Sequence, residues 1–187
     1  MPNSNTIILI IVVALIAAVV AVGLYHFYLQ WRSRHLRSHF GPEYARLAES
    51  KGDARAAESE LAGREKRVAK FHIRPLTPEE NTRFTRRWRN VQAEFVDDPK
   101  GSLSRADDLL GDVMAARGYP VQDFEQRSAD LSVDHPIVVQ HYHEAHYIAL
   151  RHRKGETTTE DLRQAMIHYR ALFDELVSDS RRATAAE

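Results

Sequence analysis

The chain has 187 residues, of which 26 are Lys or Arg, 26 are Asp or Glu and none is Cys. This length allows one domain with a core of its own, and the absence of cysteine excludes disulfide bridges and thiolate chemistry. The charge balances overall but not locally. Residues 31–91 carry 15 basic and 8 acidic side chains, whereas residues 92–187 carry 11 and 18.

The first 30 residues contain no Asp, Glu, Lys or Arg. Their centre, residues 7–25, is apolar without a polar stripe, and as a helix it would cover roughly the 30 Å of a bilayer's hydrocarbon core. The sequence therefore predicts a short tail at residues 1–5 and a transmembrane helix at residues 6–30.

Basic and aromatic side chains mark the end of this apolar stretch. Positive charges near a membrane span favour the cytoplasmic side, and aromatic rings settle at the headgroup level. The sequence thus predicts a single-pass membrane protein whose larger, C-terminal part is cytoplasmic, with membrane lipids as its first partner. The residues expected at the membrane interface are Tyr25, Tyr28, Trp31, Arg32, Arg34 and Arg37.

The alternative is a secretory signal peptide cleaved near Gly23, because Ala21 and Gly23 are small residues at the spacing of a cleavage site. The missing basic start and the long apolar run favour the uncleaved anchor. Small residues also form one face of the expected span, where they would allow two helices to pack closely in a homo-oligomer. This possible dimer face consists of Ala14, Ala17, Ala18 and Ala21.

Residues 31–76 are expected to form a basic, charged juxtamembrane segment of helices, interrupted at residues 38–42 and at Gly52. The helix at residues 53–70 has few apolar side chains, so we expect it to face solvent or a partner. A basic segment next to an anionic leaflet is attracted to it by about 1 kcal/mol per Lys or Arg, which agrees with the predicted orientation.

Residues 77–178 are expected to form a bundle-like domain of four helices with one short extra helix near residues 121–131. Thr77, Pro78 and Glu80 predict a capped helix start, and Asp134 is a candidate cap for a helix that begins near His135. Short connections make consecutive helices antiparallel. The fold class is therefore all-α, with a disordered tail at residues 179–187. The expected core positions are Phe84, Trp88, Val91, Phe95, Leu103, Ala106, Leu110, Val113, Val138, Tyr142, Ala145, Ala149, Leu162, Met166, Tyr169, Phe173 and Leu176.

Histidines gather between residues 135 and 152, and His143 and His146 have the i, i+3 spacing from which two side chains can reach one metal ion. The spacing is one residue short of the H-E-x-x-H zinc motif, and no Glu-x-x-His pair occurs in the sequence. We therefore expect no catalytic residue, no metal and no cofactor. A metal- or haem-dependent enzyme that uses this helix is the alternative.

Four arginines surround Trp88 within residues 83–89, a combination that can bind phosphate and stack a base. Glutamates on the same segment favour a solvated helix face instead, so nucleic acid or anionic lipid is a second alternative. Glycine-rich phosphate loops and the G-x-S-x-G motif do not occur in the sequence.

Four segments resemble a set of short bacterial proteins that have one N-terminal hydrophobic segment and no assigned activity. The segments are FVDDP at residues 95–99, RGYP at 117–120, DLSVDHP at 130–136 and LRQAMIHYRALFDEL at 162–176. The resemblance implies a helical domain associated with the bacterial envelope, here at the inner membrane. We expect a membrane-bound interaction or scaffold module with an unknown protein partner.

Overall fold

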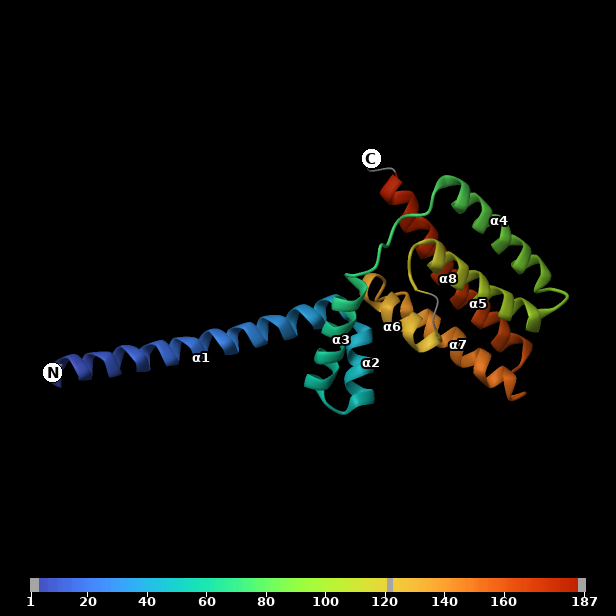
Figure 1. Cartoon of the computed structure of the whole chain (residues 1–187). Helices are drawn as coiled ribbons and strands as arrows, with labels where there is room; N and C mark the ends of the chain where they lie inside the picture. Colours follow the sequence, from blue (N-terminus) through green and yellow to red (C-terminus); the bar gives the residue numbers. More distant parts are fainter. Residues whose placement is uncertain (1–3, 121–122, 185–187) are drawn as a thin grey trace. The chain divides into compact units, whose positions relative to one another are not determined.

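The computed structural model describes the backbone of residues 4–120 and 123–184, and the side chains of residues 13–120 and 123–178. Within these ranges the chain forms helices and no strands, which confirms the predicted all-α class (Figure 1). Residues 1–39 and residues 40–187 form two separate compact units. The helices are α1 (Ser4–Phe40), α2 (Pro42–Lys51), α3 (Ala54–Val68), α4 (Pro78–Glu94), α5 (Pro99–Ala116), α6 (Phe124–Asp134), α7 (Val139–Arg153) and α8 (Thr159–Thr184).

The helix ends follow local sequence signals. Pro42 begins α2 immediately after Gly41, and Gly52 ends it in the left-handed conformation. At the start of α4, the Thr77 hydroxyl accepts from the Glu80 N–H and the Glu80 carboxylate accepts from the Thr77 N–H, which is the predicted capping box. These signals are read from a few neighbouring residues, so the sequence alone was sufficient to find them.

Helices α4, α5, α7 and α8, which we call the bundle, enclose the main apolar core (Figure 1). Helix α8 packs against both α5 and α7, and α4 packs against α5. The Trp88 ring stacks on Phe173 with their centroids 4.8 Å apart. Every core position that the sequence predicts belongs to this core or packs against it, because helical periodicity determines which side chains face inward.

Helices α2 and α3 form an antiparallel pair, which we call the hairpin, and α3 packs on α6. Ala57, Leu61 and Val68 of α3 are buried, so this helix does not depend on solvent or on another protein to cover its apolar side. The expectation of a solvent-facing or partner-facing helix at residues 53–70 is therefore wrong for that side of α3.

Two further boundaries differ from the expectation. Helix α7 begins at Val139 rather than near His135, and Asp134 is not its cap, because its carboxylate accepts a 2.6 Å hydrogen bond from the Tyr119 hydroxyl. Helix α8 continues to Thr184, so the tail predicted at residues 179–187 is helical over most of its length. Residues 185–187 of that tail, and residues 1–3 of the N-terminal tail, lie outside the described residues.

The loop after α5 passes close to the segment that joins the hairpin to the bundle. The Arg74 N–H donates to the Arg117 carbonyl at 2.9 Å, and Gly118 follows with a φ of 96°. A Cβ atom at position 118 would collide with the His72 carbonyl oxygen. Glycine is therefore required here by both the backbone conformation and the close approach.

Candidate functional site

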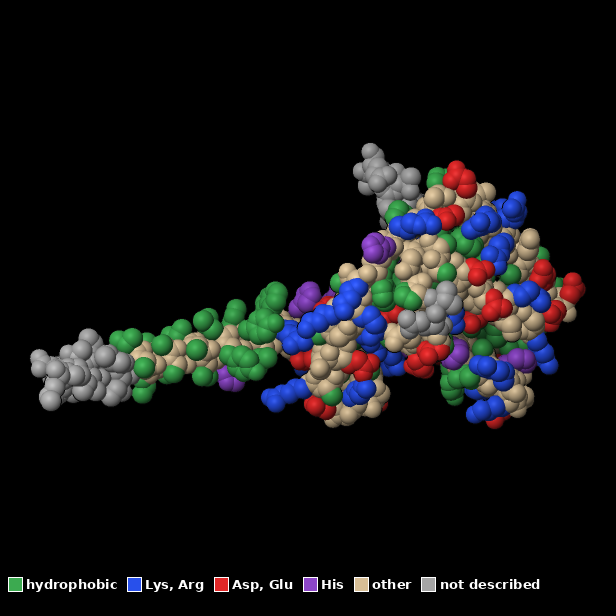
Figure 2. Space-filling view, viewed as in Figure 1, with side chains coloured by type: hydrophobic (Ala, Val, Ile, Leu, Met, Phe, Trp, Pro, Cys, Tyr) green, Lys and Arg blue, Asp and Glu red, His purple; other side chains and the backbone are tan. Residues whose placement is uncertain are grey.

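The most prominent surface of the chain is the apolar side of α1. Residues 13–40 form a helix long and apolar enough to cross a membrane, and none of its most apolar window is buried (Figure 2). Leu15, Val19 and Leu24 are each more than 60% exposed. In a water-soluble helix of this length, such side chains would face a core, so α1 has the surface of a membrane anchor or a signal sequence.

The residues predicted for the membrane interface lie on α1 just after this apolar part. Tyr25, Tyr28 and Trp31 are all more than half exposed. The Trp31 ring stacks on His35 at 5.9 Å, and His35 stacks on His39 at 5.8 Å. Arg34 and Arg37 are exposed and Arg32 is half-buried. The aromatic and basic side chains therefore share one short stretch of helix, as expected of an interface.

The four alanines of the possible dimer face, which are Ala14, Ala17, Ala18 and Ala21, are also exposed on α1. Their surface is free to contact another helix or lipid. Association through this face stays a prediction.

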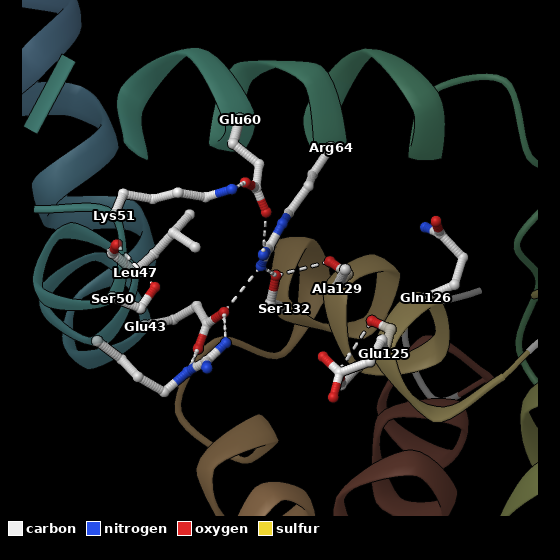
Figure 3. A network of polar contacts seen from close by, with 12 residues as sticks. Glu43, Leu47, Ser50, Lys51, Glu60, Arg64, Glu125, Gln126, Ala129 and Ser132 are labelled. Carbon is white, nitrogen blue, oxygen red and sulfur yellow. Dashed lines mark hydrogen bonds and ion pairs between the residues drawn. The ribbon is translucent and has the colours of Figure 1, made fainter. Parts of the chain in front are cut away.

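In the second unit, charged side chains meet inside the protein, between the hairpin and α6 (Figure 3). Glu43 of α2 is fully buried and accepts hydrogen bonds from Arg46 at 2.7 Å and from Arg64 at 2.8 Å. Arg64 of α3, itself only 5% exposed, also donates to Glu60 at 2.7 Å and to the Ser132 hydroxyl at 3.1 Å. We call Glu43, Arg46, Glu60, Arg64 and Ser132 the buried ionic cluster.

The electrostatics of this cluster favour the charged form of its central carboxylate. Burial alone raises the pKa of Glu43, but hydrogen bonds from Arg46 and Arg64 outweigh it and hold that pKa below its ordinary value. The pKa of Glu60 is also lowered, mainly by its hydrogen bond with Lys51. A charge left without its partner here would be costly, so the cluster fixes α2, α3 and α6 relative to one another.

His143, one of the two candidate metal ligands, lies beside this cluster. Its Nε2 is 3.8 Å from a Glu43 carboxylate oxygen and is buried without a hydrogen bond. Burial, together with the nearby Arg46, lowers the pKa of His143 to about 4, so the ring is neutral at pH 7. His143 therefore belongs to the packing of α7 against the hairpin.

His146, the other candidate, stacks face to face on the Phe124 ring, with the centroids 3.5 Å apart. Burial lowers the pKa of His146, which keeps this ring neutral as well. The described residues contain no group of three or more His, Asp or Glu side chains placed to hold a metal ion. The structure gives His143 and His146 different surroundings, and the metal alternative gains no support from them.

A hollow of about 200 Å³ lies between α5 and α7, with α8 at its floor. We call it the α5/α7 hollow. Both of its walls carry charged or titratable side chains, and its floor is partly apolar. The lining residues are Lys100, Leu103, Ser104, Asp107, Asp108, His146, Ala149, His152, Arg153 and Tyr169.

Asp107 lies at the inner end of this hollow, among two tyrosines and an arginine. Arg127 donates to one of its carboxylate oxygens at 3.3 Å, whereas the other oxygen and the Tyr142 hydroxyl are buried without a hydrogen bond. Burial, and then the charge of Asp107, raise the pKa of both Tyr142 and Tyr169. The two hydroxyls therefore stay protonated at neutral pH.

The arginine-rich part of α4 lacks the exposed ring that base stacking needs. Trp88 is only 3% exposed and belongs to the bundle core. Arg83 lies over the Phe84 ring at 4.9 Å, and Arg87 pairs with Asp112 at 2.7 Å. The segment at residues 83–89 is thus a charged outer face of a core helix, which weakens the nucleic-acid alternative.

The sequence did not reveal the buried ionic cluster or the α5/α7 hollow. Glu43 and Arg64 are 21 residues apart, and Arg64 and Ser132 are 68 apart, so no local spacing connects them. Asp107 offered one signal, because it lies next to Ala106 and one turn after Leu103 on the inward side of α5. A carboxylate at that position indicates a polar site within the core face.

Comparisons of the chain with protein-family models, with curated proteins and with solved structures found no match. The class of protein therefore rests on the structure itself, which is an N-terminal apolar helix of anchor or signal type joined to an all-helical domain.

Proposed function

We propose that this protein is a single-pass membrane protein of the bacterial inner membrane whose helical domain binds another protein at the membrane surface. The observation that carries the proposal is the exposed apolar surface of α1, which is unburied over the window that would span the bilayer. Lipid is the solvent that removes this surface from water without any protein partner.

The distribution of charge supports a cytoplasmic domain. No basic residue precedes the apolar stretch, whereas Arg32, Arg34 and Arg37 follow it directly. Basic residues next to a span favour the cytoplasmic side, where anionic lipids attract them. The proposed arrangement therefore places the N-terminus outside and residues 40–187 inside the cell.

Membrane attachment supports a binding role for the domain. A tethered domain meets partners on the same membrane at a raised effective concentration, so a small contact area is sufficient. Exposed apolar side chains on the packed pair α7 and α8, which include Tyr147, Leu150 and Ile167, offer such an area. A second copy of the chain is the simplest partner, through the alanine face of α1.

The anchor is tested by membrane fractionation. We expect the full chain to stay in the membrane pellet after alkaline extraction, and Ala17→Arg to raise the fraction that is released, because a charge within a span costs about 2.5–3.5 kcal/mol. The matched control is Ala93→Arg, which adds the same charge to an exposed position of α4. Mature chains that begin near Leu24 would contradict the anchor and support cleavage.

Sidedness and self-association need separate measurements. A C-terminal alkaline phosphatase fusion should be inactive if the domain is cytoplasmic, and an active fusion would contradict that orientation. Because the chain has no cysteine, Ala17→Cys creates a single thiol, which should form disulfide-linked dimers on mild oxidation of membranes. Leu15→Cys lies about 160° around the helix from Ala17 and is the control. Equal yields from both variants, or none, would exclude the alanine face.

A further inference from the structure

Two histidines face each other across the packed helices α7 and α8. The Nδ1 atom of His141 lies 2.9 Å from the Nδ1 atom of His168, and the centroids of the two rings are 5.2 Å apart. We call these two residues the histidine pair. They are 27 residues apart in the sequence, so no local spacing connects them.

The core beneath the histidine pair fixes the backbone on both sides. Each histidine is followed by a buried tyrosine, Tyr142 on α7 and Tyr169 on α8, and the two tyrosine rings are 6.3 Å apart. Helices α7 and α8 pack directly on each other. Side chains that the fold already holds close together lose little freedom when they bind a common ligand.

The two rings can present both of their lone pairs to one point. In the contact between them either Nδ1 can be the donor, because the proton of a neutral imidazole occupies Nδ1 or Nε2. Burial, and then His141, lower the pKa of His168, so this ring is neutral at pH 7. Both rings are half-buried, which leaves them room to turn toward solvent. With the protons on Nε2, two Nδ1 lone pairs would repel each other unless a cation lies between them.

We propose that the histidine pair binds a divalent transition-metal ion, with the Nδ1 atoms of His141 and His168 as adjacent ligands. Imidazole nitrogens bind such ions at about 2.0–2.1 Å. Two bonds of this length at a right angle separate the nitrogens by about 2.9 Å, whereas a tetrahedral angle needs about 3.3–3.4 Å. The observed 2.9 Å therefore matches the square-planar or tetragonal arrangement that Cu²⁺ and Ni²⁺ prefer.

The remaining coordination positions are open to water. The described residues contain no group of three or more His, Asp or Glu side chains placed around one ion, so the pair supplies the protein ligands by itself. A site with two imidazoles and bound water follows the usual order of affinity, in which Cu²⁺ binds more tightly than Ni²⁺ or Zn²⁺.

The test is calorimetric titration of the full chain, in detergent micelles and without an affinity tag, with CuCl₂, NiCl₂ and ZnCl₂. His35 and His39 lie one turn apart on α1 and could bind a metal ion by themselves, so the titration uses a His35→Gln/His39→Gln background. We expect one Cu²⁺ per chain with a Kd below about 10 µM, and weaker binding of the other two ions. No saturable binding of any of the three, or Zn²⁺ bound more tightly than Cu²⁺, would overturn the proposal.

Two variants assign the metal ion to the histidine pair. His141→Gln and His168→Gln each remove one ligand and keep a polar side chain, so each should weaken Cu²⁺ binding at least about tenfold. The matched controls are His72→Gln, at an exposed position, and His152→Gln, which changes a ring that contacts the Thr157 hydroxyl at 2.8 Å. Both controls should leave the Kd unchanged. An unchanged Kd in both variants of the pair, or an equal loss in the controls, would contradict the assignment.

A measurement of stability tests whether the ion links α7 to α8. An ion that binds the folded chain in preference to the unfolded chain raises the free energy of unfolding. Saturating Cu²⁺ should therefore raise the midpoint of chemical denaturation, and removal of the ion with EDTA should reverse the change. His141→Gln should keep the midpoint of the metal-free protein and lose the increase. No increase in the parent protein, or the same increase in His141→Gln, would overturn the proposal. None of these measurements depends on the membrane topology proposed above.

Discussion

In the bundle, α4, α5, α7 and α8 meet through apolar side chains, whereas the hairpin meets α6 and α7 partly through charges. Trp88 and Phe173 contact each other within a continuous apolar core. Glu43 and Arg64 are buried to about the same degree as Trp88 and Phe173, but hydrogen bonds between charged groups hold them in place. An apolar contact tolerates partial loss, while a buried ion pair that loses one partner leaves a costly charge behind. The two regions should therefore respond differently to substitution and to pH.

The largest expected effect is that of Arg64→Ala. Removal of the guanidinium leaves Glu43 buried with only Arg46 as its main partner, and we expect a loss of about 3–5 kcal/mol in the free energy of unfolding. The measurement is chemical denaturation of the full chain in micelles, followed by Trp88 fluorescence in a Trp31→Phe background. The double variant Glu43→Leu/Arg64→Met should recover most of that loss, because it removes both charges. A double variant as unstable as the single one would contradict this account of the hairpin.

A truncation in the bundle gives the apolar counterpart. Leu110 is fully buried, so Leu110→Ala should cost about 2–5 kcal/mol through lost burial and the cavity that remains. Chemical denaturation in micelles, as for Arg64→Ala, measures this change in the free energy of unfolding. Its cost should be independent of pH between 7 and 4, unlike that of changes in the buried ionic cluster. A cost that changes over this range would show that the two regions are not energetically separate.

His143 should make stability depend on pH. Its pKa is about 4 in the folded protein against an ordinary value of 6.5, so the unfolded chain takes up a proton first as the pH falls. The neutral His143 ring contributes fully to the free energy of unfolding above pH 6.5. That contribution is lost progressively as the pH falls toward 4, and the total loss is about 3 kcal/mol. His143→Gln should flatten the measured dependence over this range. His152→Gln is the control, and a slope unchanged by His143→Gln would exclude this role.

The smallest expected effect is at the boundary between the two regions. Thr77→Ala removes the hydroxyl that accepts from the Glu80 N–H, and we expect a loss of about 1 kcal/mol. Thr82→Ala, at an exposed position one turn later, should cost less than about 0.5 kcal/mol. Equal losses would mean that the capping box does not stabilise α4 more than an ordinary surface contact does.

The sequence predicted the bundle better than the hairpin for a physical reason. The stripe of Phe84, Trp88 and Val91 repeats with the period of a helix, so its burial is evident from the sequence. The packing of α3 is not evident, because Arg64 and Arg67 reach Ser132 and Asp130 of α6, which are more than 60 residues away. Charged side chains that pack against α6 make the helix look solvent-facing in the sequence.

The candidate site was predictable only in part. The apolar stretch and the aromatic and basic residues after it are signals carried by composition, and α1 presents them as one helix. The α5/α7 hollow depends on how two helices far apart in the sequence approach each other, and composition carries no signal of that. His143 and His146 illustrate the limit, because their spacing suited a metal ion while their neighbours, Glu43 and Phe124, gave them other surroundings.

Gly118 has a consequence for the recognition of related chains. The backbone at this position is left-handed and passes so close to His72 that no larger side chain fits. Among distant sequences that share little else, we would expect an unvarying glycine a few residues after the α5 segment, with a proline soon after it. This glycine and this proline would then help to identify homologous sequences whose overall identity is low.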